Sequence, residues 1–215
     1  MQDVVRYNTR DFDYFVSLIS TAVKGRDAED IARKLLTRYL KIENVIMADI
    51  RDLEAIVGNK AAVFLKLVGY LTSRRVTEQF VVGKVYTTAE IQNYFKALFI
   101  GASVETVYLM SFDKRGGFIS CDAVAEGTVN SSDVLPRKLV EIAKSVGASS
   151  VAIAHNHPFG NSTPSSEDRD LVYSLQNIFN AVGIRFEYHC VVAGQDCATV
   201  RPNIVEYNNR SRSEI

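Results

Sequence analysis

The chain has 215 residues, enough for one large domain or two modest ones, and 47% of them are hydrophobic, which is sufficient for a core. Lysine plus arginine equals aspartate plus glutamate, 25 each, so the neutral net charge argues against a protein that coats nucleic acid. No apolar run approaches the roughly 18 residues of a membrane span, and the amino terminus lacks a signal-peptide pattern. We therefore expect a cytoplasmic protein without a membrane partner.

Residues 1–80 predict helices, because apolar side chains recur there at helical spacing. The first helix is expected to end at Lys24-Gly25-Arg26, and Asp27 to cap a second helix that extends through Leu40. A short third helix should end at Gly58, and a fourth should run from about residue 60 to 75. The amino-terminal part is therefore predicted to be a small all-α domain.

The pattern then changes to a mixture of strands and helices. Residues 79–86 should connect the two parts, and Thr87 or Thr88 should cap an amphipathic helix that ends near residue 101. Residues 104–112 and 118–124 predict a hairpin, and a helix with Leu139 and Ile142 on its apolar face should follow. Further strands are expected at residues 185–192 and 197–200, which gives a mixed α/β order.

The segment between these elements carries the chemistry. Residues 149–155 read as a buried strand ending at His155, with His157 two positions later, and a new helix follows a Pro-, Gly- and Ser-containing loop. His155 and His157 can point the same way from an extended chain, and Asp168 lies in the first turn of the helix. Two imidazoles and one carboxylate suit a catalytic zinc that keeps its fourth position for water. The alternative is a polar loop whose histidines are satisfied by backbone hydrogen bonds.

His155-x-His157, seven residues, then Ser165-x-x-Asp168 resembles the JAMM motif of the JAB/MPN metallopeptidase superfamily. The longer run from His155 through Pro158 and Thr163 to Ser165 is similar to the bacterial RadC branch. The resemblance implies a mixed-sheet, cytidine-deaminase-like JAB/MPN sandwich at residues 81–205, after a degenerate helix-hairpin-helix-like domain at residues 1–80. A polar tail at residues 206–215 would follow.

The resemblance also implies a function: a zinc-dependent hydrolase that cleaves an amide or isopeptide bond of a peptide or protein substrate with zinc-bound water. His155, His157 and Asp168 would bind the ion. Glu105 matches the family's proton-transferring glutamate, and Ser165 would stabilise the oxyanion. Glu126 is the second candidate for the glutamate, although its register in the resemblance is wrong.

Other interpretations remain open. A DNA-binding accessory protein would use a hairpin at Gly58, which lacks the family's second glycine, and the basic side chains Lys60, Lys66, Arg74 and Arg75. A metal-stabilised interaction module without turnover is the other rival. RadC proteins commonly read Asp-His where this chain has Tyr188-His189, so we expect a histidine satisfied beside the sheet and not a fourth ligand. Cys190 and Cys197 are expected to be small buried hydrophobic residues.

Overall fold

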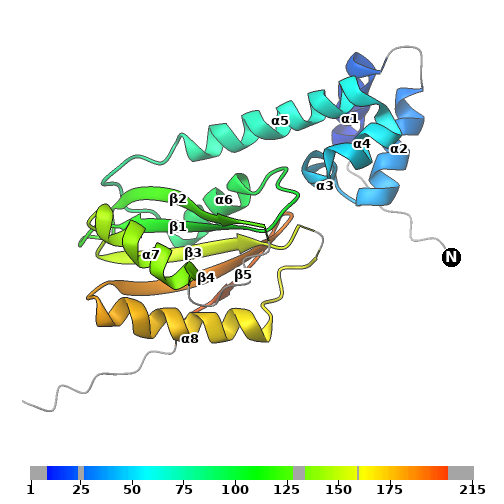
Figure 1. Cartoon of the computed structure of the whole chain (residues 1–215). Helices are drawn as coiled ribbons and strands as arrows, with labels where there is room; N and C mark the ends of the chain where they lie inside the picture. Colours follow the sequence, from blue (N-terminus) through cyan, green and yellow to red (C-terminus); the bar gives the residue numbers. More distant parts are fainter. Residues whose placement is uncertain (1–8, 24–26, 128–133, 159, 203–215) are drawn as a thin grey trace, which may run out of the picture.

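The structure is a computed structural model that describes residues 9–23, 27–127, 134–158 and 160–202. A helical region is followed by a sheet with helices on its two faces (Figure 1). The described elements, in chain order, are α1 (Thr9–Ala22), α2 (Ala28–Tyr39), α3 (Ile42–Met47), α4 (Ile50–Val57), α5 (Asn59–Thr77), α6 (Thr88–Leu98), β1 (Thr106–Phe112), β2 (Phe118–Glu126), α7 (Val134–Ser145), β3 (Ser150–Asn156), α8 (Ser166–Ala181), β4 (Arg185–Ala193) and β5 (Asp196–Val200).

The five strands form one mixed sheet in the order β2-β1-β3-β4-β5. Strands β3 and β4 are parallel, because α8 carries the chain back across the sheet between them, and the other neighbouring pairs are antiparallel. Strand β3 lies at the centre and every one of its residues is buried, as its continuous apolar run predicts. This arrangement confirms the predicted mixed α/β fold class.

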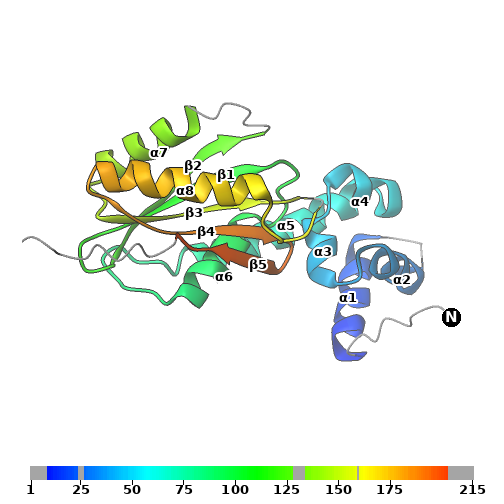
Figure 2. The same ribbon diagram turned by 90° about the horizontal axis from the view of Figure 1, so that it is seen from below.

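The sheet is the middle of three layers, with α6 on one face and α7 and α8 on the other (Figure 2). Side chains alternate between the faces, so Ala152 and Ala154 of β3 pack on the α6 side, whereas Val151 and Ile153 pack against α7 and α8. His155 continues the second series. Its ring therefore emerges on the α8 face at the carboxyl end of the central strand.

The helical region has its own apolar core, built from α1, α2, α4 and α5 with Val45 of α3. Asp27 caps α2 as predicted, and Gly58, with φ of 84°, joins α4 directly to α5. Two details differ from the prediction. The short helix α3 was not predicted, and Leu40 lies beyond the end of α2, 56% exposed and with φ of 67°, instead of on its apolar face.

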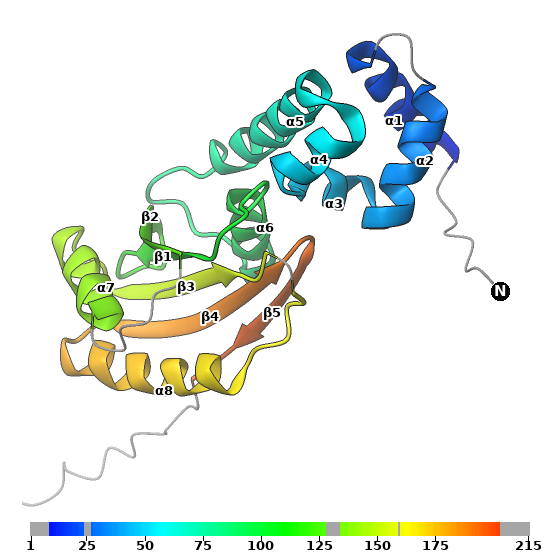
Figure 3. The same ribbon diagram turned by 45° about the vertical axis from the view of Figure 1, so that its right-hand side comes forward.

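Helices α3 and α5 connect this region to the sheet (Figure 3). The ammonium group of Lys66 on α5 donates to the main-chain carbonyls of Ile46, Ala48 and Gly101 at 3.3, 2.9 and 3.4 Å. These are three acceptors for its three N–H groups. Lys66 therefore links the two parts of the chain. The sequence analysis had grouped it with other basic side chains and did not predict this role.

Strands β4 and β5 are linked by a disulfide between Cys190 and Cys197, whose Cα atoms are 6.5 Å apart. The prediction that they act as small buried hydrophobic residues was therefore wrong in chemistry, although Cys190 is fully buried. The two residues are neighbours only because the β-turn at Gly194 folds β5 back onto β4, a register that cysteine spacing does not encode. Disulfides are common in oxidising compartments, so this pairing does not support the expected cytoplasmic location, which stays a prediction.

Two sequence expectations fall outside the described residues: the helix end at Lys24-Gly25-Arg26 and the polar tail at residues 206–215. Within the described part of the chain, no helix is both long and apolar enough to span a membrane.

Candidate metal centre

The two histidines of the motif converge at the end of β3. The Nε2 atoms of His155 and His157 lie 2.9 Å apart. Asp168, from the first turn of α8, approaches both rings, with Oδ1 3.3 Å from Nε2 of His155 and Oδ2 3.9 Å from Nε2 of His157. The structure therefore brings together all three residues that the motif predicted as metal ligands.

These separations suit a small divalent ion. With metal–ligand bonds of about 2.0–2.1 Å, the ligand atoms of a tetrahedral zinc site lie roughly 3.3–3.5 Å apart. The distance from His155 to Oδ1 of Asp168 lies at that value, the distance between the two histidines is shorter, and His157 is nearest to the other carboxylate oxygen, Oδ2, so the side chains would shift to accommodate the ion. The His157 side chain is 22% exposed and those of His155 and Asp168 are 11% and 12% exposed, which leaves one side of the group open. Nitrogen and oxygen ligands with an open side are typical of catalytic zinc.

A capping box at the start of α8 positions Asp168. The Oγ of Ser165 accepts from the main-chain N–H of Asp168 at 3.0 Å, and Oδ2 of Asp168 accepts from the main-chain N–H of Ser165 at 2.8 Å. The Ser165 hydroxyl also donates to that oxygen at 2.7 Å. Burial by itself raises the pKa of Asp168, but the Ser165 hydrogen bonds and the nearby His155 outweigh burial and hold the pKa below its usual range. The carboxylate is thus kept ionised, as a metal ligand must be.

Ser165, predicted to bind an oxyanion, is therefore the residue that caps α8 and orients Asp168 in this structure. The residue itself is exposed.

Glu105 directly precedes β1 and is exposed. Burial lowers the pKa of His155, and the carboxylates of Asp168 and Glu105 act in the opposite direction. Glu105 therefore acts electrostatically on the metal group. Asn156 holds the peptide groups on both sides of Glu105: Oδ1 accepts from the N–H of Thr106 at 2.8 Å, and Nδ2 donates to the carbonyl of Val104 at 3.0 Å. The side chain between the two histidines therefore fixes the backbone of the predicted proton-transfer residue.

The third histidine completes the cluster, and this was not predicted. Nε2 of His189, on β4, lies 2.7 Å from Nδ1 of His155. His189, His155 and Asp168 also have ligand atoms within 4.8 Å of one another. Burial, together with the nearby His155, lowers the pKa of His189 to about 3. No local motif marks this role, but the alternation of β4 places His189 on the same face as Val191, and the parallel pairing with β3 brings it to His155.

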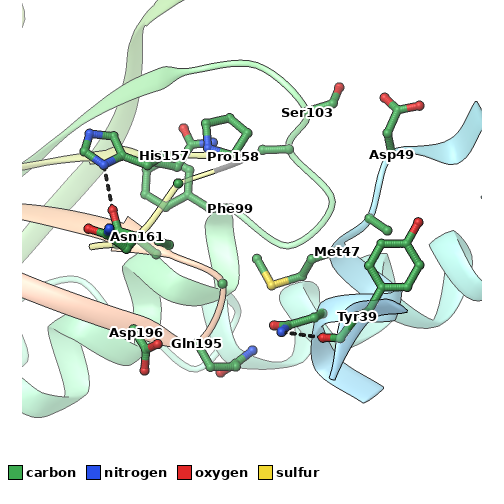
Figure 4. Close-up of a pocket in the computed structure, with 18 of the residues that line it drawn as sticks. Tyr39, Met47, Asp49, Phe99, Ser103, His157, Pro158, Asn161, Gln195 and Asp196 are labelled. Carbon is green, nitrogen blue, oxygen red and sulfur yellow. Dashed lines mark hydrogen bonds between the residues drawn. The ribbon is translucent and has the colours of Figure 1, made fainter. Parts of the chain in front are cut away.

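A cleft of about 390 Å³ lies at the junction of the two regions and reaches the metal group at His157, whereas His155, Asp168 and Glu105 do not line it (Figure 4). His157 and Asn161 line one wall, and Nδ1 of His157 is 2.8 Å from the carbonyl oxygen of Asn161. Tyr39, Met47 and Asp49 of the helical region form the opposite side, and the turn between β4 and β5 adds Gln195 and Asp196. A substrate that reaches His157 through this cleft would contact both regions.

Comparison with known proteins gives consistent results. Residues 85–203 match the model of a family described as the RadC-like JAB domain. A UPF0758 protein of Janthinobacterium sp. (strain Marseille) is 28% identical over 189 residues, which cover 86% of this chain and 84% of the relative. A UPF0758 protein of Bordetella petrii is 30% identical over 188 residues with the same two coverages, and one of Chromobacterium violaceum is 29% identical over 187 residues, again 86% and 84%.

Proposed function

The chain belongs to the RadC-like JAB domain family, and on that basis we propose that it is a zinc-dependent hydrolase of the JAMM type that cleaves an amide or isopeptide bond. The observation that carries this proposal is the convergence of His155, His157 and Asp168 at an open site with zinc-like ligand separations. A zinc ion bound there would supply Lewis-acid activation of water and of the substrate carbonyl.

Glu105 is the residue that accepts and returns the proton in this proposal. It is exposed, ahead of β1, and its carboxylate acts electrostatically on His155. A proton-transfer residue must be held near the reacting atoms, because misplacement by about 1 Å is enough to cost activity. The two hydrogen bonds of Asn156 to the peptide groups around Glu105 supply that restraint.

Ser165 would contribute its hydroxyl to the developing oxyanion. In this structure the hydroxyl donates to Asp168, but the main-chain N–H of Ser165 donates to the same carboxylate oxygen at 2.8 Å. Asp168 therefore keeps a donor when the hydroxyl turns towards a substrate carbonyl. The exposed position of Ser165 is compatible with that rotation.

The recessed metal group, with the cleft beside His157, favours a substrate that presents its scissile bond in an extended, flexible segment. Metal ligands with side chains only 11–22% exposed are recessed, and a folded surface does not reach them. The walls combine apolar, amide and charged side chains, such as Met47, Asn161 and Asp49. A peptide tail or an isopeptide-linked segment meets this requirement.

The test combines elemental analysis with a cleavage assay. We expect about one zinc per chain in the wild type and loss of zinc in the His157→Ala variant, with circular dichroism unchanged because the apolar cores do not depend on the site. Cleavage of a mixed peptide library, followed by mass spectrometry, should require zinc and should be abolished in Glu105→Gln, which keeps the metal.

Two results would contradict the proposal. A folded wild-type protein that binds no zinc, even when zinc is supplied, has no metal-dependent activity. A protein that unfolds when zinc is removed, and that cleaves nothing when it is loaded, fits the metal-stabilised interaction module instead.

A further inference from the structure

His189 lies directly beneath the metal centre and has no role in the proposed reaction. It is 1% exposed, on β4, in a region of the sheet that is otherwise filled by apolar side chains. A buried polar ring in such a place is costly unless its nitrogens are hydrogen-bonded. The ring nevertheless makes only one hydrogen bond of normal geometry within the described residues, through Nε2 to His155.

The two nitrogens of His155 face different partners. Nε2 is directed at His157 and Asp168, whereas Nδ1 is 2.7 Å from Nε2 of His189. A neutral imidazole carries its proton on one nitrogen only. If Nε2 of His155 is to offer its lone pair to a metal ion, its proton must lie on Nδ1, and the atom opposite must be an acceptor.

From this geometry we propose that His189 is a positioning residue, which accepts the Nδ1–H of His155 and so fixes both the tautomer and the ring plane in which His155 presents Nε2 to the metal. This inference rests on the metal centre of the proposed function. It requires that His189 carry its own proton on Nδ1. That nitrogen is buried and makes no hydrogen bond of normal geometry with a described residue.

The competing assignment is that His189 is itself a ligand, since it groups with His155 and Asp168. Two observations favour the positioning role. Nε2 of His189 lies against Nδ1 of His155, whereas Nε2 of His155 faces Asp168, so His189 contacts the nitrogen of His155 that would not bind the metal. In addition, His189 is held in the interior of the sheet, whereas His157 follows the end of β3 and is open to the cleft.

The test is a comparison of zinc affinities, measured by competition with a chromophoric chelator, in the full-length protein. His189→Gln retains an acceptor oxygen that can reach the Nδ1–H of His155, and His189→Leu removes the acceptor. We expect the Leu variant to bind zinc about 10- to 100-fold more weakly, which is the usual effect of losing such a partner, and the Gln variant to stay within about threefold of the wild type. Tyr188→Phe, which changes the neighbouring residue on the opposite face, is the matched control and should bind as the wild type does.

Nitrogen-15 NMR of the zinc-loaded wild type supplies a second measurement that does not depend on either variant folding. We expect His155 to carry its proton on Nδ1 and His189 to be the Nδ1–H tautomer with a bare Nε2. The opposite tautomer of His189 would overturn the proposal.

Each remaining outcome is decisive. Equal zinc affinity in the Leu variant and the wild type, or equal loss in the Gln and Leu variants, overturns the acceptor role. Loss of zinc in both His189 variants together with its retention in His157→Ala identifies His189 as a ligand instead. If the wild type itself binds no zinc, the proposed function fails, and the positioning role fails with it. If the positioning role alone fails, the wild type still binds zinc, and the failure shows in the variants or in the tautomer of His189.

Discussion

Asn156→Ala should destabilise the protein far more than the loss of one polar side chain usually does. The Asn156 side chain is 3% exposed and makes two hydrogen bonds, to the N–H of Thr106 and the carbonyl of Val104. Its removal leaves both backbone groups without these partners in a half-buried setting. An unsatisfied buried group costs about 1–3 kcal/mol, so the free energy of unfolding should fall by roughly 2–5 kcal/mol. That is a large share of the roughly 5–15 kcal/mol by which domains are stable.

Asn44→Ala is the matched control, because the half-buried Asn44 makes a single side-chain hydrogen bond, from Nδ2 to the carbonyl of Tyr39 at 2.8 Å. Its expected loss is about 0.5–1.5 kcal/mol. Urea denaturation of the metal-free proteins measures both values. Hydrogen exchange followed by NMR should also show that the amide of Thr106 exchanges faster in Asn156→Ala but not in the control. A loss below about 1 kcal/mol, with Thr106 still protected, would refute the view that Asn156 holds the Glu105 segment.

Two further predictions concern pH and packing. The metal-free protein should lose stability as the pH falls from about 6.5 towards 3, because the pKa values of His155 and His189 are lowered in the folded state and the unfolded chain therefore binds protons first. Each group contributes at most about 1.4 kcal/mol per pH unit. Urea denaturation measured across this pH range should show a flatter profile for His189→Gln than for the wild type. Gly69→Ala should destabilise the protein by roughly 1–2 kcal/mol despite the better helix propensity of alanine, because the added Cβ would lie 2.6 Å from Cγ2 of Ile46 and 2.9 Å from Cγ2 of Ile100. Thermal unfolding measures this, with the exposed substitution Thr72→Ala as the control, and a stabilised Gly69→Ala protein would contradict the prediction.

Predictions from local sequence were confirmed where a single segment contains all the residues that determine its structure. The apolar run before His155 predicts a strand buried on both faces, and the structure has β3 there. Asp27 and either Thr87 or Thr88 were predicted as helix caps, since a side-chain cap acts within one turn, and the structure has caps at Asp27 and Thr87. Ser165 and Asp168 are three residues apart, so the capping box that orients the carboxylate is likewise a local feature.

Short elements without a strong local signal were missed. Helix α3 has six residues and no side-chain hydrogen bond that caps its start. It packs against α5, a contact that the sequence of neither segment predicts. Isolated helices of this length are not stable in water, so its conformation is decided by tertiary packing.

The sequence alone determined the fold class, the position of the motif and the three residues that meet at the candidate metal centre, because strand periodicity and a helix cap fix how a chain segment presents its own side chains. Only the tertiary structure decided which distant residues join them. His189 reaches His155 through the parallel pairing of β3 with β4, and Asn156 reaches the Glu105 segment where β1 begins and β3 ends. Lys66 and the disulfide depend likewise on partners far along the chain or on strand register. These contacts are set by register and packing between elements, which no single stretch of sequence contains.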